Sequence, residues 1–252
     1  MTGANLKVTG GEVVLIVGAA GVGTSRIVAA TLGEVAPSEG RIEVLGRDVG
    51  KLRRSSLRLL RRRVGIVPQD LCLLEDRSAQ LNVVLPLEID GMPRSVSILR
   101  AAGMLTQLGL SSEASLPVDC LSASARQRVA VARALVRDPE LIVADHPTSA
   151  QDAEGCERVC EAFYEAASRG ASVVIFGRDP ALRALADRNK WRQLALLEGA
   201  LRPVGDVELD GQSIEDILVG IDSAPATVHP LPDPAIPNVL PFPITARTAG
   251  AR

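Results

Sequence analysis

The stretch VVLIVGAAGVGTS, residues Val13–Ser25, decides the fold class. Its first five residues are continuously apolar, which is typical of a strand that is buried on both faces of a sheet. The glycines at 18, 21 and 23 predict a tight loop, and Ser25–Leu32 has the composition of a short helix that ends at Gly33. A buried strand, a glycine loop and a helix in this order predict an α/β protein.

The glycine loop has a spacing that suits phosphate binding. In the pattern GxxxxGK[ST], backbone N–H groups and the start of the following helix hold phosphate oxygens, and the last residue contacts Mg²⁺. Thr24 stands where this pattern has lysine. Arg26 is close by, but each residue turns a helix by about 100°, so its side chain points elsewhere. The predicted nucleotide-binding residues of this segment are Gly18, Ala19, Ala20, Gly21, Val22, Gly23, Thr24, Ser25 and Arg26.

Strands and helices alternate beyond the glycine loop, which predicts a mostly parallel sheet with helices on both faces. Leu6–Val8 and Val13–Val17 are interpreted as a hairpin or two strands. Residues 76–120 are predicted to form helical stretches broken by Pro86, Pro93 and Pro117. The segment 221–252 is rich in proline and poor in charge, so we expect a disordered tail there.

Three further segments follow the glycine loop in order, at residues 67–70, 121–139 and 141–149. Their sequences are VPQD, LSASARQRVAVARALVRDP and LIVADHPTS. Together with the glycine loop, they resemble the motifs of the ATP-binding-cassette (ABC) ATPases, and the resemblance covers residues 5–215. The run from Asn82 to Ile89, with Gly91–Arg94, resembles the branch that serves lipoprotein release, macrolide export and cell division.

This resemblance implies a P-loop NTPase core of the RecA type, with an ABC ATPase-like domain over 1–220 and a helical subdomain over about 75–125. In the family, ATP lies between one subunit's glycine loop and the signature of a second ABC subunit, and the helical subdomain docks on a transmembrane permease. ATP and Mg²⁺ are therefore the implied cofactors, and the implied location is cytoplasmic, peripheral on the inner face of the membrane. The implied magnesium contacts are Ser25, Gln69 and Asp145.

Several positions depart from the family's pattern. The signature LSGGQ is replaced by Leu121, Ser122, Ala123, Ser124 and Ala125. The Cβ atoms that replace the two glycines hinder the close approach of a phosphate. His146 stands where the family has its general-base glutamate, and Arg178 stands where it has its switch histidine. Ser149–Asp152 resembles the loop that crosses the dimer interface in the family.

No aromatic residue precedes Phe163, so the ring on which the family stacks adenine, ahead of the glycine loop, is missing. Base stacking is worth ~1–3 kcal/mol and a charge-assisted phosphate contact ~1.5–3 kcal/mol, so their loss weakens nucleotide binding by about two to four decades. Losing the general base costs a further ~10²–10⁴ in rate. The sequence therefore predicts a degenerate nucleotide-binding subunit with weak or absent ATP hydrolysis, which serves as a structural or regulatory partner of the permease and of the second ABC subunit.

Two other interpretations stay open at this point. One is an active ATP-hydrolysing subunit that powers export, with His146, Arg178 or Arg26 in changed catalytic roles. The other is a non-transport scaffold that is coupled to a permease-like protein of the cell envelope.

Composition excludes some classes of function. The net charge of -2 does not supply the positive field that nucleic-acid binding requires, so no nucleic-acid partner is predicted. The one basic cluster, within 53–63, is interpreted as a solvated helix face or as a surface near anionic lipid headgroups. No apolar run approaches the ~20 residues of a membrane helix. There is no CxxC pair, and the four cysteines are interpreted as buried or neutral thiols.

Overall fold

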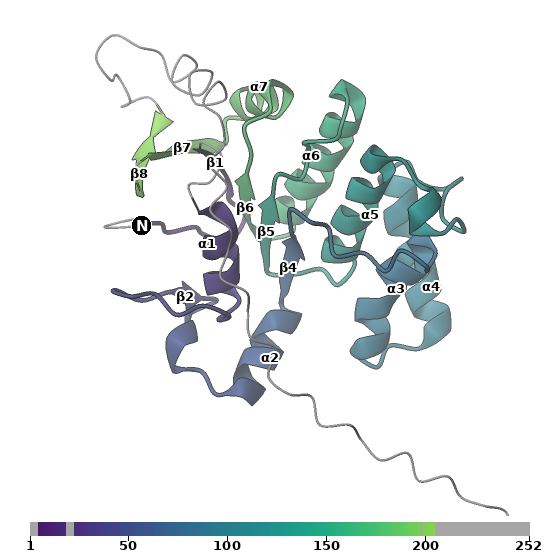
Figure 1. Ribbon diagram of the computed structural model, residues 1–252, viewed down its shortest axis with the longest axis horizontal. Helices are drawn as coiled ribbons and strands as arrows, with labels where there is room; N and C mark the ends of the chain where they lie inside the picture. The colour runs from purple at the N-terminus through teal and green to yellow at the C-terminus, as the bar shows by residue number, and fades with distance from the viewer. Residues whose placement is uncertain (1–4, 19–22, 198, 205–252) are drawn as a thin grey trace, which may run out of the picture.

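A six-stranded sheet forms the centre of the protein (Figure 1). The computed structural model describes residues 5–18, 23–197 and 199–204. The strand order is β4-β5-β6-β1-β7-β8, with parallel pairing from β4 to β7 and antiparallel pairing of β7 with β8. The mostly parallel sheet predicted from the sequence is thereby confirmed. The strands are β1 (Val13–Gly18), β4 (Val64–Val67), β5 (Leu141–Asp145), β6 (Ser172–Phe176), β7 (Arg192–Leu197) and β8 (Ala200–Pro203).

Strand β1 is buried along its whole length, as its continuous apolar run predicts. Its side chains alternate between the two faces of the sheet. Leu15 belongs to the larger core cluster, whereas Ile16 belongs to the cluster on the other face. The larger cluster includes side chains of α5 (Ala123–Leu135), α6 (Ala153–Ser168) and α7 (Pro180–Arg188). The smaller one includes Val28 of α1 (Thr24–Thr31).

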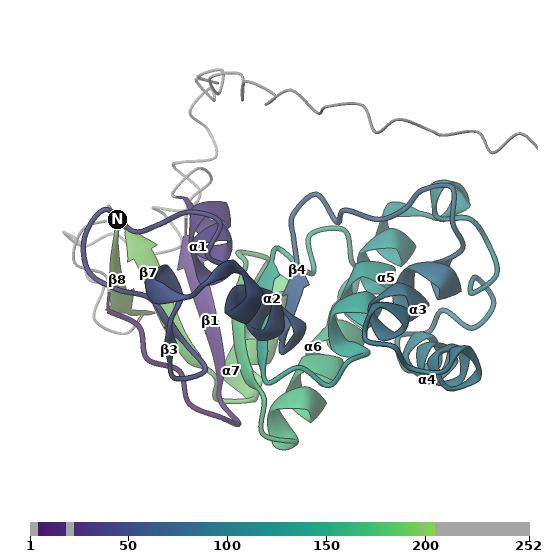
Figure 2. The same cartoon turned by 90° about the horizontal axis from the view of Figure 1, so that it is seen from below.

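A third, small core cluster lies beside the main sheet. It joins the two-stranded sheet of β2 (Glu43–Val44) and β3 (Arg47–Asp48) to the 3₁₀ helix η1 (Val49–Lys51) and to α2 (Arg54–Arg62). Leu60 is the buried side chain that α2 contributes to this cluster. Helix α2 lies at the lower edge of the molecule in Figure 1 and faces the viewer in Figure 2.

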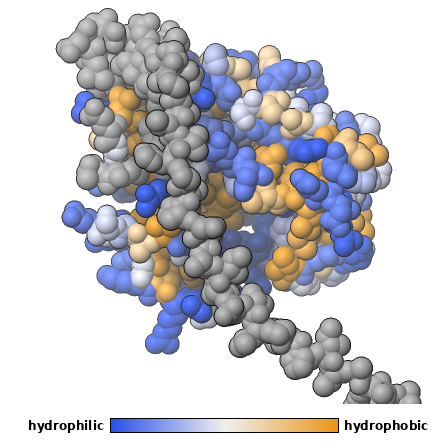
Figure 3. All heavy atoms as spheres, viewed as in Figure 1, coloured by the Kyte–Doolittle hydropathy of each residue, from blue (hydrophilic) through white to orange (hydrophobic). Residues whose placement is uncertain are grey.

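A lobe of helices stands at one side of the sheet (Figure 1). It contains α3 (Ala79–Ile89), α4 (Arg94–Gln107) and the 3₁₀ helix η2 (Val118–Cys120), and both α3 and α4 pack against α5. Hydrophobic surface is visible among polar side chains on this lobe in Figure 3. The subdomain boundaries at about 75 and 125 stay a prediction.

The structure corrects two local predictions. Pro86 does not break a helix but lies inside α3, because the burial of Val83, Val84 and Leu87 offsets the ~3 kcal/mol that an internal proline costs. Leu6–Val8 is not a strand, since this segment is largely exposed. The prolines at 93 and 117 do lie at the ends of helical segments, where they precede α4 and η2.

Two further predictions concern residues that the structure does not describe. The predicted tail at 221–252 lies outside the described residues, as do Ala19–Val22 of the glycine loop. Within the described ranges, no helix combines the length and the apolar composition that crossing a bilayer requires.

Candidate nucleotide-binding site

The carboxyl ends of the parallel strands bring the predicted site residues to one edge of the sheet. Gly18 ends β1, Asp145 ends β5, Gln69 lies two residues after β4, and Arg178 lies two residues after β6. In open α/β sheets this edge is where ligands bind, because the loops that leave parallel strands gather there.

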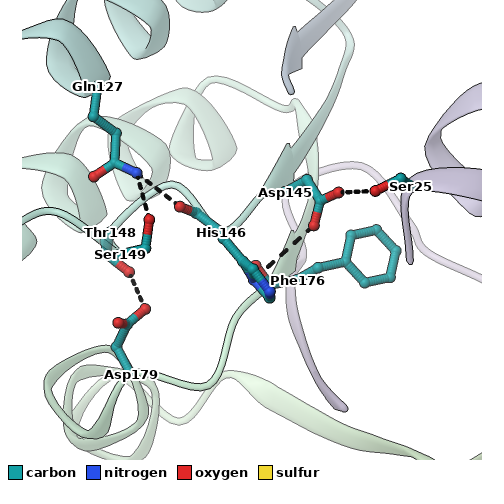
Figure 4. Close-up of polar contacts among 8 residues, drawn as sticks. All are labelled: Ser25, Gln127, Asp145, His146, Thr148, Ser149, Phe176 and Asp179. Atoms are coloured by element: carbon teal, nitrogen blue, oxygen red, sulfur yellow. Dashed lines mark hydrogen bonds and ion pairs between the residues drawn. The ribbon is translucent and has the colours of Figure 1, made fainter. Parts of the chain in front are cut away.

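Ser25 and Asp145 meet at this edge, although 120 residues separate them in the sequence (Figure 4). The Ser25 hydroxyl donates a hydrogen bond of 2.9 Å to Oδ2 of Asp145. Asp145 is only 2% exposed, and its other oxygen, Oδ1, is buried without a hydrogen-bond partner among the described residues. A buried carboxylate with an unused oxygen beside a hydroxyl offers the oxygen ligands that Mg²⁺ prefers. These two residues therefore fit the predicted metal.

The start of helix α1 supplies the phosphate-facing part of the site. Gly23 precedes the helix with φ at +94°, a left-handed conformation that glycine adopts without steric cost. The first four N–H groups of a helix lack partners within it, and the helix dipole adds positive potential there. Thr24 is the first helical residue, so the position implied for lysine carries a short, neutral side chain.

His146 directly follows strand β5 in a left-handed conformation with φ at +52°. Its backbone N–H donates to the carbonyl of Phe176 at 2.8 Å, and its ring Nδ1 lies 3.3 Å from the same oxygen. Nδ1 also lies 4.0 Å from Oδ1 of Asp145. The ring is thus folded back onto the end of β6, as Figure 4 shows. When Nδ1 carries the proton and donates to Phe176, Nε2 is left as the acceptor.

Gln69 is exposed and makes no hydrogen bond with Ser25 or Asp145 in the described structure. It lines a cavity of about 410 Å³ whose walls also come from the start of α5 and from Ser149 and Ala150. The loop after Gln69 is held against α5, because Arg133 of that helix donates hydrogen bonds to the carbonyls of Leu71 and Cys72, each at 2.5 Å. Both of these loop residues have left-handed backbones. The role of Gln69 as a magnesium contact stays a prediction.

The signature segment Leu121–Ala125 begins helix α5. Ser122 is the N-cap, and its side chain accepts a hydrogen bond of 3.1 Å from the N–H of Ala125. The helix starts at Ala123, because Ser122 satisfies one of the free N–H groups. Ala123 and Ser124 therefore occupy the first helical turn.

Ser124 and Gln151 hydrogen-bond each other in both directions. The Ser124 hydroxyl donates to Oε1 of Gln151 at 3.0 Å, and Nε2 of Gln151 donates to the Ser124 carbonyl at 2.9 Å. Nε2 of Gln151 also donates to Oε1 of Gln127 at 3.0 Å. These bonds join the signature to the segment Ser149–Asp152, which we call the interface loop, within the same chain.

Gln127 is the centre of this network and is only 4% exposed. Its Nε2 donates to the carbonyl of His146 at 2.8 Å and to the hydroxyl of Ser149 at 3.0 Å (Figure 4). Its Oε1 accepts from the N–H of Ala150 at 3.1 Å. One amide side chain on α5 thereby holds the turn after β5 and the interface loop in place.

The other residues of this edge have structural contacts as well. Thr148 is buried, and its hydroxyl donates to Asp179 at 2.8 Å, so the loop after β5 is tied to the loop after β6. Asp152 is the N-cap of α6 and accepts from the N–H of Gly155 at 2.8 Å. Arg178 is exposed.

Sequence reasoning did not single out Gln127, Gln151 or the bond between Thr148 and Asp179. A signal for Gln127 was present, because it is an amide within a helix whose other inward positions are apolar. Gln151 and Thr148 have no such signal, since their partners are distant in the sequence.

Cys156 and Cys160 are buried on α6, whereas Cys72 and Cys120 are exposed. A hydrogen bond with Cys156 and burial raise the pKa of Cys160. Among the described residues, no group of three or more histidine, cysteine or acidic side chains is arranged to hold a metal ion.

Comparison with known proteins decides the family. The model of the ABC transporter family matches residues 1–149, more than half of the chain. The chain belongs to the ABC transporter family. A solved dimeric ATP-binding cassette in a post-hydrolysis state, bound to ADP and Pi, aligns with a TM-score of 0.72 at 29% identity over 79% of this chain and 87% of that one. The fold is the α/β P-loop NTPase fold of ABC cassettes, as the sequence predicted.

Two curated relatives illustrate the range of the match. The methionine import ATP-binding protein MetN of Brucella abortus (strain 2308) is 35% identical over 190 residues, which are 75% of this chain and 52% of the relative. The lipoprotein-releasing system ATP-binding protein LolD of Bacteroides fragilis (strain YCH46) is also 35% identical over 190 residues, which are 75% of this chain and 88% of the relative. The chain spans about half the length of the methionine import relatives. The two relatives are equally identical to this chain. Sequence identity therefore does not distinguish the lipoprotein-release branch, which the run from Asn82 to Ile89 resembles, from the methionine import proteins.

Proposed function

We propose that this chain is a degenerate nucleotide-binding subunit of an ABC transporter, with weak ATP·Mg²⁺ binding and weak or absent ATP hydrolysis. It works beside a transmembrane permease and a second ABC subunit, at the inner face of the membrane. The lipoprotein-releasing and methionine import relatives are named for their transport systems, and this supports a role in transport.

The observation that carries the proposal is the pair of hydrogen bonds between Ser124 and Gln151. The family resemblance implies that the signature faces a nucleotide held by a second subunit. Here the hydroxyl and the carbonyl of Ser124 hydrogen-bond Gln151 within the chain, and Ser122 caps its own helix. A phosphate would have to displace these bonds, and it would meet the Cβ atoms of Ala123 and Ser124.

The other half of the site supports weak binding rather than none. Ser25 and Asp145 keep the arrangement that fits Mg²⁺. Thr24 supplies no charge to a phosphate, and His146 is held against Phe176 rather than replacing a carboxylate. When bound, Mg²⁺ would neutralise phosphate charge, and Ser25 and Asp145 are the residues that would hold it.

ATP turnover by the purified full-length chain tests this proposal. We expect a rate close to background that does not fall further in Ser25→Ala or Asp145→Ala. Ser168→Ala, an exposed serine on α6, is the matched control for Ser25→Ala. Turnover at a rate ordinary for the family that collapses in Asp145→Ala would contradict the proposal, and its collapse in His146→Ala would favour a rewired active ATPase.

The permease interaction has its own test. We propose that the region from Gln69 to Ile89 docks on the permease, because Leu85 and Ile89 expose 36% and 59% of their surface on α3. A tagged chain is expected to recover an integral membrane protein from detergent-solubilised membranes with or without ATP. Ile89→Asp should abolish this recovery, whereas Tyr164→Asp, an exposed position on α6, should not. Equal recovery by both variants would refute this docking site.

A further inference from the structure

The segment from Arg41 to Arg63 carries a concentration of positive charge that the nucleotide site does not use. It holds nine arginines and lysines against two acids, a net charge of +7 in a chain whose total is -2. Part of this charge has structural work, because Arg62 pairs with Asp90, and Arg63 pairs with Glu140. Arg61 donates to the carbonyl of Leu32 at 2.8 Å.

Three arginines at the start of α2 have no such intramolecular contacts. Arg53, Arg54 and Arg58 are exposed, and none of their side chains forms a hydrogen bond or an ion pair within the described parts of the chain. The first turn of α2 contains no acidic residue. Cations near the positive end of a helix dipole cost about 0.3–1 kcal/mol each. The folded chain therefore gains no stability from these charges.

An apolar side chain lies beside them. Arg54 and Arg58 are four residues apart and so share one face of the helix. Leu59 follows Arg58 and exposes 58% of its surface. Arg62, one turn beyond Arg58, reaches Asp90, which caps the end of α3 next to the exposed Ile89. The outer face of α2 thus continues to the region where we propose that the permease docks.

We propose that the basic face of Arg53, Arg54, Arg58 and Leu59 binds the anionic headgroups of a phospholipid bilayer. Unpaired arginines on an exposed helix attract anionic lipid, and an adjacent leucine can enter the headgroup region. Nucleic acid fits this face less well, because the rest of the chain is negative and no aromatic side chain before Phe163 is available for base stacking. The inference rests on the proposed function, since a permease-bound subunit lies beside the membrane.

Vesicle binding by the full chain, without nucleotide, tests this inference. The probes are phosphatidylcholine vesicles and vesicles of two parts phosphatidylcholine to one part phosphatidylglycerol. We expect binding only to the anionic vesicles, weakened by added salt. The triple variant Arg53→Gln, Arg54→Gln and Arg58→Gln should bind about 100-fold more weakly, at ~1 kcal/mol per arginine and ~1.4 kcal/mol per decade.

A second triple variant is the control, with Arg158→Gln, Arg188→Gln and Arg202→Gln on α6, α7 and β8. It removes the same charge from positions outside α2, of which Arg188 and Arg202 are exposed and Arg158 is half-buried, and it should bind like the native chain. Urea unfolding confirms that both variants fold. Equal loss in both variants, native-like binding by the α2 variant, absence of binding to anionic vesicles, or a preference for polyglutamate or single-stranded DNA over vesicles would each overturn the inference. ATP titration of the same variants, expected to be unchanged, distinguishes its failure from that of the proposed nucleotide function.

Discussion

The two ends of the candidate nucleotide site differ in how their polar groups are used. At the end formed by α1 and β5, Asp145 keeps a buried oxygen without a partner among the described residues, and Gly23 at the start of α1 provides no side-chain cap. At the end formed by α5, Ser124 and Gln151 satisfy each other, and Ser122 satisfies the helix that it begins. The first end therefore keeps a polar group that a ligand could use. At the second end, which we call the closed end, the side chains of Ser122 and Ser124 already hydrogen-bond within the chain.

Under the proposed function, this difference means that the two ends of the nucleotide site have diverged unequally. The Ser25–Asp145 contact joins α1 to β5 and holds the edge of the sheet together, so it has a structural value besides metal binding. The signature end has gained a structural value of its own through Gln127, which ties α5 to the turn after β5. Both ends are therefore stable, but we propose that only the first still meets a nucleotide.

The largest expected effect concerns the general base. The triple variant Thr24→Lys, Ala123→Gly and Ser124→Gly supplies the lysine and glycines that the family resemblance implies, and a fourth change, His146→Glu, supplies the carboxylate. At saturating ATP we expect the fourfold variant to turn over about 10²–10⁴ times faster than the triple variant. Steady-state phosphate release measures this ratio. Equal rates would mean that His146 already serves as the base.

A large effect on stability is expected at the centre of the closed end. Gln127→Leu should lower the free energy of unfolding by about 2–4 kcal/mol, because the His146 carbonyl and the Ala150 N–H lose their buried partners. Urea denaturation followed by circular dichroism measures the change. Gln107→Leu on α4, which loses only a bond to Glu165, should cost less than about 1 kcal/mol. The comparison between the two ends fails if the two variants are equally stable.

The smallest effect is expected at the amino edge of the sheet, away from the site. Arg63 donates two hydrogen bonds of 2.5 Å to Glu140, and this lowers the pKa of Glu140. The pair therefore stabilises the fold above the unfolded-state pKa of Glu140, and this contribution is lost as the pH falls through the lowered folded-state pKa. Because both side chains are about half exposed, Glu140→Gln should reduce the urea midpoint at neutral pH by much less than Gln127→Leu does. A midpoint difference that grows on acidification would contradict this.

The sequence was sufficient for the parts of the fold that depend on local pattern. Val13–Val17, Leu141–Ala144 and Val173–Phe176 are continuous apolar runs, and all three lie in central parallel strands. The prediction that Pro86 breaks a helix was wrong, because the burial of α3 outweighs the local cost of a proline inside a helix. Leu6–Val8 has strand composition but lacks the burial that would stabilise a strand.

The sequence predicted only those site residues that belong to a known motif. Ser25 and Asp145 were predicted to share a metal, and the structure places them in contact. The bond between Ser124 and Gln151 joins residues 27 positions apart, and no local pattern indicates it. Its consequence, a signature end that is closed within the chain, required the three-dimensional structure.

Calorimetric titration of the full chain with ATP·Mg²⁺ tests the central claim, that this site lacks a group to grip the triphosphate. We predict weak binding by the native chain and binding that is about 10- to 100-fold tighter in Thr24→Lys, because one charge-assisted phosphate contact is worth ~1.5–3 kcal/mol. Ser168→Lys, which adds the same charge at an exposed position on α6, should leave the affinity unchanged. Tight binding by the native chain that Thr24→Lys does not improve would contradict the account.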